Sequence, residues 1–165
     1  MSEEHSGDLP PVDLDEPDMA ELQEVILEFL SRYEGLYEKR IQKLVFYGDV
    51  RTAEKTGERL TNASFAPYDF GPYSKAIRQA LDELREDGRV MVREDGQYVT
   101  ALESGDLSPK KQYLIAKIHE DTRRMSTPEL VDRAKDTWLW KEFTYAEEMD
   151  FTTYVDDVLM APEER

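Results

Sequence analysis

The dipeptide Asp95-Gly96 restricts the fold of this 165-residue chain more than any other local feature. It separates two segments of alternating hydrophobicity, residues 89–94 and 97–102. Asp-Gly between two such segments is the favoured two-residue turn of a β-hairpin. Pairing about this turn sets Val92 opposite Val99 and Val90 opposite Ala101. The sequence therefore predicts a hairpin with one apolar face.

Before the hairpin, apolar side chains recur with the period of an α-helix. A first helix is predicted to begin at Asp18, where Asp18-x-x-Glu21 matches a capping box, and to end before Gly35. A second is predicted over residues 36–56, with Gly57 as its C-terminal cap. After an extended stretch, Pro72 suits the first position of a third helix that Gly88 ends.

Three more helical segments follow the hairpin, at residues 109–124, at 127–140 and near 151–160. Ser126-x-x-Glu129 is a second candidate capping box, at the start of the middle segment. The predicted fold class is α+β and mostly α-helical. The order of elements fits a winged-helix-like unit, made of helices plus a β-hairpin, with additional C-terminal helices.

Charge is distributed unevenly along the chain. The net charge is −16, yet residues 1–31 hold ten acids and no Lys or Arg, and residues 137–165 hold eight acids against two bases. The middle of the chain is balanced. Two interpretations of the excess of acidic residues stay open. It could be an adaptation of the surface to a salty (halophilic) cytoplasm, or the acidic ends could dock a basic partner. A role in coating nucleic acid is disfavoured, because the negative charge of the chain would repel the phosphates of the nucleic acid.

The domain boundary is predicted where composition changes. Residues 1–17 are polar, acidic and rich in proline, and are predicted to form a disordered arm. Residues 18–160 are predicted to form one domain. No apolar stretch approaches the roughly 20 residues that cross a bilayer, and the N-terminus has no basic start of a signal peptide. A cytoplasmic protein without membrane contact is expected.

The residue inventory disfavours catalysis. The chain has no cysteine and two histidines, His5 in the predicted arm and His119 in a predicted helix. No two glycines lie closer than eight residues, which excludes the glycine-rich phosphate loops. We expect no catalytic residues, no cofactor and no metal site, and we predict that the protein is not an enzyme.

A winged-helix DNA-binding regulator is the alternative function. The third helix would be the recognition helix and would present Lys75 and Arg78, and the hairpin would add Arg89 and Arg93. Acidic residues at positions 82, 83, 86 and 87 cancel that charge within the same helix. DNA binding is therefore possible on sequence grounds but disfavoured.

Aromatic residues cluster around Gly71-Pro72. Phe65, Tyr68, Phe70 and Tyr73 lie within nine residues of sequence. These rings could belong to the core, or some could line a surface groove, because aromatic side chains beside a rigid corner make good interface anchors.

The same region carries a resemblance to a known family. The motifs are Gln-Lys-Leu-Val-Phe-Tyr at 42–47, Thr-Gly-Glu-Arg-Leu at 56–60, Ala-Pro-Tyr-Asp-Phe-Gly-Pro at 66–72, and a late helix at 130–141 that ends in Trp-Lys. In this order and spacing they resemble the Panacea domain of SocA-like antitoxins. A Thr-His pair usual in the family's late helix is replaced here by Ala134-Lys135.

The resemblance implies a prokaryotic antitoxin of a toxin–antitoxin system that neutralises a cognate toxin, encoded nearby, by direct contact. We expect the contact to centre on the Gly71-Pro72 corner, with Tyr68, Phe70 and Tyr73 supplying contact area and Lys75 and Arg78 at the rim. The competing hypothesis is that the corner only packs the third helix onto the second. The sequence leaves the oligomeric state open.

Overall fold

Helix α2 (Glu38–Thr56) passes through the middle of the molecule. All ten residues 41–50 are buried, so this helix has no solvent-facing side over almost three turns. Helices α1, α4 and α5 and strand β3 pack around it. A Cβ at Gly48 would lie 3.1 Å from Leu60 and 3.2 Å from Phe29, so glycine lets these neighbours approach the helix closely.

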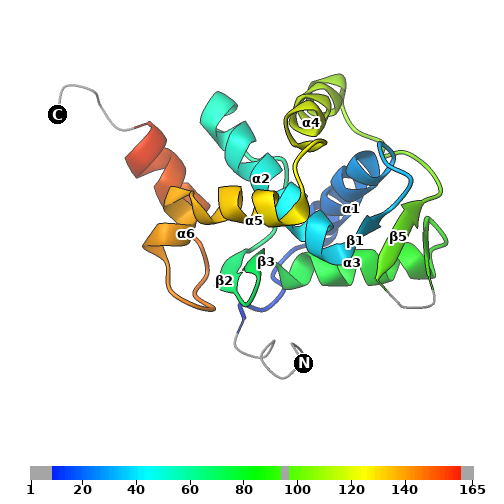
Figure 1. Cartoon of the computed structure of the whole chain (residues 1–165), viewed down its shortest axis with the longest axis horizontal. Coiled ribbons are helices and arrows are strands. Elements are labelled where there is room, and N and C mark those ends of the chain that lie inside the picture. The colour runs from blue at the N-terminus through cyan, green and yellow to red at the C-terminus, as the bar shows by residue number, and fades with distance from the viewer. Residues whose placement is uncertain (1–8, 94–96, 161–165) are drawn as a thin grey trace.

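The computed structural model describes residues 9–93 and 97–160 (Figure 1). The elements follow in the order α1 (Glu16–Leu30), β1 (Leu36–Tyr37), α2, β2 (Ala66–Tyr68), β3 (Gly71–Tyr73), α3 (Lys75–Glu86), β4 (Val90–Val92), β5 (Tyr98–Ala101), α4 (Pro109–Thr122), α5 (Thr127–Lys135), α6 (Trp138–Glu142), α7 (Phe151–Thr153) and the π-helix η3 (Tyr154–Leu159). The mostly α-helical α+β class is confirmed. The winged-helix topology stays a prediction.

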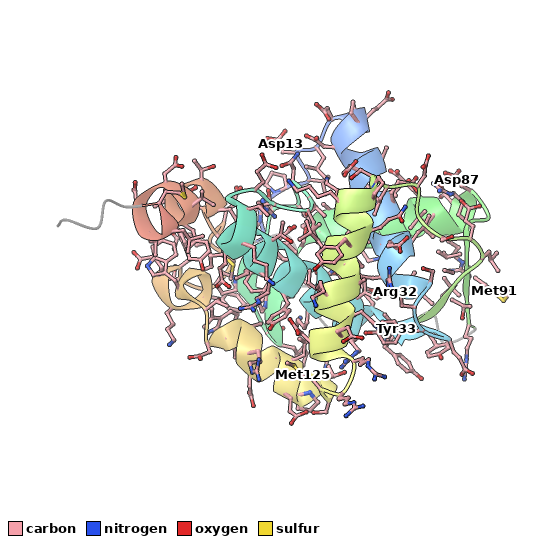
Figure 2. The ribbon with its side chains drawn as sticks, turned by 90° about the horizontal axis from the view of Figure 1, so that it is seen from above. Asp13, Arg32, Tyr33, Asp87, Met91 and Met125 are labelled. Atoms are coloured by element: carbon pink, nitrogen blue, oxygen red, sulfur yellow. The ribbon has the colours of Figure 1, made fainter. Side chains whose placement is uncertain are left out.

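A three-stranded antiparallel sheet of order β1-β5-β4 lies at one end of the molecule (Figure 1). Its register pairs Val92 with Val99 and Val90 with Ala101, as predicted. The predicted turn residues Asp95 and Gly96 lie outside the described residues. Met91, on the opposite face from the valines, is 58% exposed and projects outward (Figure 2).

The second helix begins two residues later than predicted. Leu36 pairs with Val99, so residues 36 and 37 form strand β1 instead of the first turn of α2. Gly57 ends α2 as predicted, with a φ of 80°. Helix α4 then crosses the outside of α1 and α2 (Figure 2).

The first helix begins earlier than predicted. Asp15 caps α1 by accepting a 2.9 Å hydrogen bond from the backbone N–H of Asp18, so the predicted capping box at Asp18 is wrong. Pro17 near the first position explains this start, because its fixed φ suits the first turn. Residues 1–8 of the predicted arm lie outside the described residues, whereas Leu9 is buried beside Ala66 and Tyr68.

The third helix begins later than predicted. Pro72 pairs with Pro67 in the β2–β3 hairpin, and Ser74 caps α3 by accepting a hydrogen bond from the backbone N–H of Ala76. The prediction that Pro72 starts the helix is wrong, because proline also fits an extended strand that needs no N–H at that position.

The C-terminal helices are more broken than predicted. The helix expected over residues 127–140 is interrupted at Asp136, and Thr137 caps a separate α6. The capping box of Ser126 and Glu129 is confirmed at the start of α5. The segment near 151–160 divides into α7 and η3, and the Tyr154 hydroxyl donates a 3.1 Å hydrogen bond to Glu54 of α2.

The buried carboxylate of Asp49 fixes the segment that follows α2. It accepts hydrogen bonds from the backbone N–H and the hydroxyl of Thr61, at 2.9 and 2.7 Å. Arg59 donates to it at 2.7 Å and also to the backbone oxygen of Ala63 at 2.6 Å. The guanidinium of Arg59 lies 3.7 Å from the ring centroid of Phe151, so the same network reaches α7. Asp49 therefore orders the chain between α2 and the β2–β3 hairpin.

We predict that Asp49→Ala lowers the free energy of unfolding by roughly 3 kcal/mol, because it leaves Arg59 and Thr61 inside the protein without their acceptor. Urea denaturation followed by circular dichroism measures the change. Asp136→Ala is the control, since Asp136 is 77% exposed in its pair with Lys141 and should contribute less than about 1 kcal/mol. Equal effects of the two substitutions would show that the Asp49 network does not stabilise the fold.

Candidate functional site: the β2–β3 hairpin

Strands β2 and β3 form a tight hairpin with Asp69 and Phe70 at its tip. Ala66 pairs with Tyr73, Pro67 with Pro72 and Tyr68 with Gly71. Gly71 has a φ of +111°, which residues with a Cβ rarely adopt, and a Cβ there would lie 3.0 Å from Cε of Lys43. Glycine is therefore needed at this corner for both conformation and space.

Two polar residues of α2 hold the base of the hairpin through its backbone. The Nζ of Lys43 donates a 2.9 Å hydrogen bond to the backbone oxygen of Pro72. The side-chain amide of Gln42 donates to the backbone oxygen of Ser74 at 3.0 Å and accepts from its N–H at 2.9 Å. All of these groups are buried, so water does not compete for the bonds. The motif at 42–47 thus positions the motif at 66–72.

The loop after α6 supports the other side of the hairpin. The backbone N–H groups of Ala146 and Met149 donate 2.8 Å hydrogen bonds to the oxygens of Pro67 and Phe65. The ring of Tyr145 stacks on Tyr68 with centroids 5.7 Å apart, and its hydroxyl donates a 2.6 Å hydrogen bond to Asp69. The hairpin is therefore held on both sides, and its tip is left at the surface.

The seven residues predicted from the sequence lie in one continuous segment, but their exposure differs. Phe70 at the tip is 60% exposed. Tyr73 at the end of β3 and Lys75 and Arg78 in the first turns of α3 are half-buried. The remaining three, Tyr68, Gly71 and Pro72, are buried.

Glu38 organises the flank of the hairpin. Arg78 forms ion pairs with Glu38 and, at 2.7 Å, with Asp82. The hydroxyl of Tyr73 lies 3.4 Å from the Glu38 carboxylate. Burial raises the pKa of Tyr73, and the negative charge of Glu38 raises it further, so this hydroxyl stays protonated at physiological pH.

Two lysines that the sequence analysis missed lie near the hairpin. Lys39 places its Nζ 4.4 Å from the ring centroid of Phe70, and Lys135 places its Nζ 5.4 Å from the ring of Trp140. Lys39 precedes Lys43 by one helical turn, and a like-charge pair at this spacing is unfavourable in a helix. That spacing is the feature of the sequence that could have drawn attention to Lys39 and Lys43 on α2. Nothing in the sequence connects Lys135 with it, because α5 meets α2 only in the folded chain.

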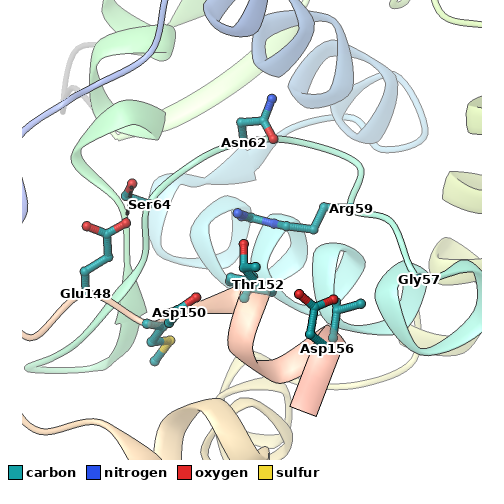
Figure 3. A pocket seen from close by; sticks show the side chains of 11 residues that line it. Gly57, Arg59, Asn62, Ser64, Glu148, Asp150, Thr152 and Asp156 are labelled. Carbon is teal, nitrogen blue, oxygen red and sulfur yellow. Dashed lines mark hydrogen bonds between the residues drawn. The ribbon is translucent and has the colours of Figure 1, made fainter. Parts of the chain in front are cut away.

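A separate cavity of about 620 Å³ lies between the segment after α2 and the C-terminal helices (Figure 3). Several of its polar residues already bind one another or their neighbours. Glu148 accepts a 3.2 Å hydrogen bond from Ser64, Asp150 caps α7 and Arg59 pairs with Asp49. These contacts account for Glu148, Asp150 and Arg59 without a ligand.

Two further features bear on the type of site. In residues 9–93 and 97–160, no group of three His, Asp or Glu side chains is placed to hold a metal ion. Within the same residues, no helix is both long enough and apolar enough to cross a membrane.

The buried Lys43 gives stability a specific pH dependence. Burial lowers its pKa to about 8, and the positive charge of Lys39 contributes. In the unfolded chain the pKa returns to about 10.4, so the unfolded state binds more protons between these two values and stability rises with pH there. Relative to Lys43→Met, the wild type should gain about 2 kcal/mol of unfolding free energy between pH 7 and pH 9.5.

Urea titrations of both proteins at each pH measure this difference. Tyrosine titration is common to both proteins and cancels. A difference that stays constant with pH would contradict the prediction.

A comparison with protein families matches residues 41–141 to the model described as antitoxin SocA-like, Panacea domain. The match begins in α2, includes the whole β2–β3 hairpin and ends in α6. Neither a curated protein nor a solved structure matches the chain. The matched residues make up more than half of the sequence, and the protein therefore belongs to the SocA-like antitoxin family with a Panacea domain.

Proposed function

We propose that this protein is the antitoxin of a toxin–antitoxin pair and neutralises its toxin by direct contact with the β2–β3 hairpin. Family membership supports the antitoxin role. The main support for the location of the contact is the exposed phenyl ring of Phe70, which lies on a hairpin whose base α2 holds rigidly. The role is one of binding and includes no catalytic step.

Phe70 has the properties of an interface anchor. Burying a phenylalanine side chain that was exposed contributes about 1.5–3 kcal/mol. The hydrogen bonds of Lys43 and Gln42 hold the hairpin base at Pro72 and Ser74, so binding orders little beyond the ring itself. Tyr145, which is 51% exposed and bonded to Asp69, adds a second aromatic surface beside the tip.

The buried and half-buried candidates have different roles in this proposal. Tyr68, Gly71 and Pro72 shape the corner and set the direction of the tip. Tyr73, Lys75 and Arg78 lie on its flank, where a partner seated on Phe70 would reach them. The purely structural hypothesis accounts for the three buried residues and leaves the exposed ring at the tip without a role.

Charge pairing disfavours the alternative of a DNA-binding regulator. Arg78 is paired with Glu38 and Asp82, and Arg89 with Glu24 at 3.0 Å and Glu103 at 2.6 Å. Phosphate contacts would have to displace these carboxylates. The net charge of −16 opposes binding further.

Co-expression with the neighbouring gene tests the proposal. Wild type should restore growth, and Phe70→Ala should abolish the rescue or weaken binding of the purified neighbouring gene product by on the order of tenfold to a hundredfold. Tyr113→Ala is the matched control, because Tyr113 is 62% exposed on α4 and should rescue fully.

Melting temperatures of both variants show that any loss is not a loss of folding. Full rescue by Phe70→Ala would place the contact elsewhere. A neighbouring gene that is not toxic would overturn the antitoxin proposal itself.

A further inference from the structure

Three lysines lie beside the β2–β3 hairpin, with the buried Lys43 at its base and Lys39 next to Phe70 at its tip. Lys39 and Lys43 lie one turn apart on α2, and Lys135 lies at the end of α5, which packs on α2. Both outer lysines are near enough to Lys43 for their charges to disfavour its protonation. Val131, one turn before Lys135, would contact a Cβ at Gly71 at 3.6 Å, which places this face of α5 against the hairpin.

No carboxylate of the described residues forms an ion pair with any of these three lysines. The described ion pairs engage Arg32, Arg51, Arg59, Arg78, Arg89, Lys111 and Lys141 instead. Three nearby acids already have partners: Glu38 binds Arg78, Asp69 accepts from Tyr145 and Asp136 binds Lys141. A chain of net charge −16 thus places three lysines without an ion-paired carboxylate beside one hairpin.

Aromatic rings hold the two outer ammonium groups in place of carboxylates. Lys39 lies over Phe70 and Lys135 over Trp140. A ring face attracts the cation but accepts none of its hydrogen bonds in full, so the N–H donors stay available to a carboxylate from outside.

We infer that the partner docks on this surface through an acidic segment, whose carboxylates pair with Lys39 and Lys135 while an apolar side chain covers Phe70. This inference rests on the proposed function and specifies the chemistry of the toxin's contact. Complementary charge at an interface fixes register and excludes wrong partners.

Charge also distinguishes this partner from a second copy of the chain. Two copies, each of net charge −16, repel one another at long range. The same field attracts a basic partner and does not repel a neutral one. We therefore expect the acidic segment to be a local feature of a partner that is not itself strongly acidic.

Charge reversal with a matched control tests the inference. The variant Lys39→Glu/Lys135→Glu changes the patch, and Lys55→Glu/Lys117→Glu makes the same change of net charge at two exposed lysines elsewhere, on α2 and α4. Binding of the purified neighbouring gene product is measured by calorimetry at low and high salt. The patch variant should bind on the order of a hundredfold more weakly, and the control variant within about threefold of wild type.

The variant Lys39→Arg/Lys135→Arg keeps the charges and should retain binding, and wild-type affinity should fall as salt rises. Equal binding by the patch and control variants would overturn the inference and leave the antitoxin proposal standing. Wild type that neither binds nor rescues would overturn both. A wild-type dimer that the patch reversal dissociates, measured by light scattering, would assign the surface to a second copy and also overturn the inference.

Discussion

Polar side chains inside a fully surrounded helix determine where the rest of this chain can run. Gln42, Lys43 and Asp49 lie in the buried stretch of α2, and each needs hydrogen-bond partners that water cannot supply. Asp49 finds them in the segment after the helix, and Gln42 and Lys43 find them in the backbone of β3 and the start of α3. The hydrogen bonds that the buried polar side chains of α2 require therefore fix the segment after α2, the β2–β3 hairpin and the direction of α3.

This anchoring separates the base of the hairpin, which α2 holds, from the exposed tip, which we propose meets a partner. The hydrogen bonds from α2 go to backbone oxygens and an N–H, and none of them engages a side chain at the tip. The negative field of the chain and the positive patch beside Phe70 then act at different ranges. In our proposal the overall charge influences which molecules approach, and Lys39 and Lys135 select the partner that binds at the tip.

The sequence predicted those features that depend on local pattern. The register of the β4–β5 hairpin and the cap at Ser126 follow from neighbouring residues alone, and both are confirmed. Pro72 was misassigned because proline fits a helix start and a strand equally well, and only the pairing with Pro67 decides between them. A lysine such as Lys43 is expected at the surface. It is buried because α5 and the hairpin pack over it, and the hydrophobic pattern along α2 does not show where those elements pack.

The contacts of α2 with the segment that follows it also have a consequence for the order of folding. The hydrogen bonds from Gln42, Lys43 and Asp49 span between 10 and 32 residues of sequence. Closing loops of this length loses less chain entropy than closing the loops of 65 and 100 residues between Glu24 and Arg89 and between Glu54 and Tyr154. Low contact order favours early formation. Residues 38–74 should thus acquire protection from hydrogen exchange before the C-terminal helices dock on them.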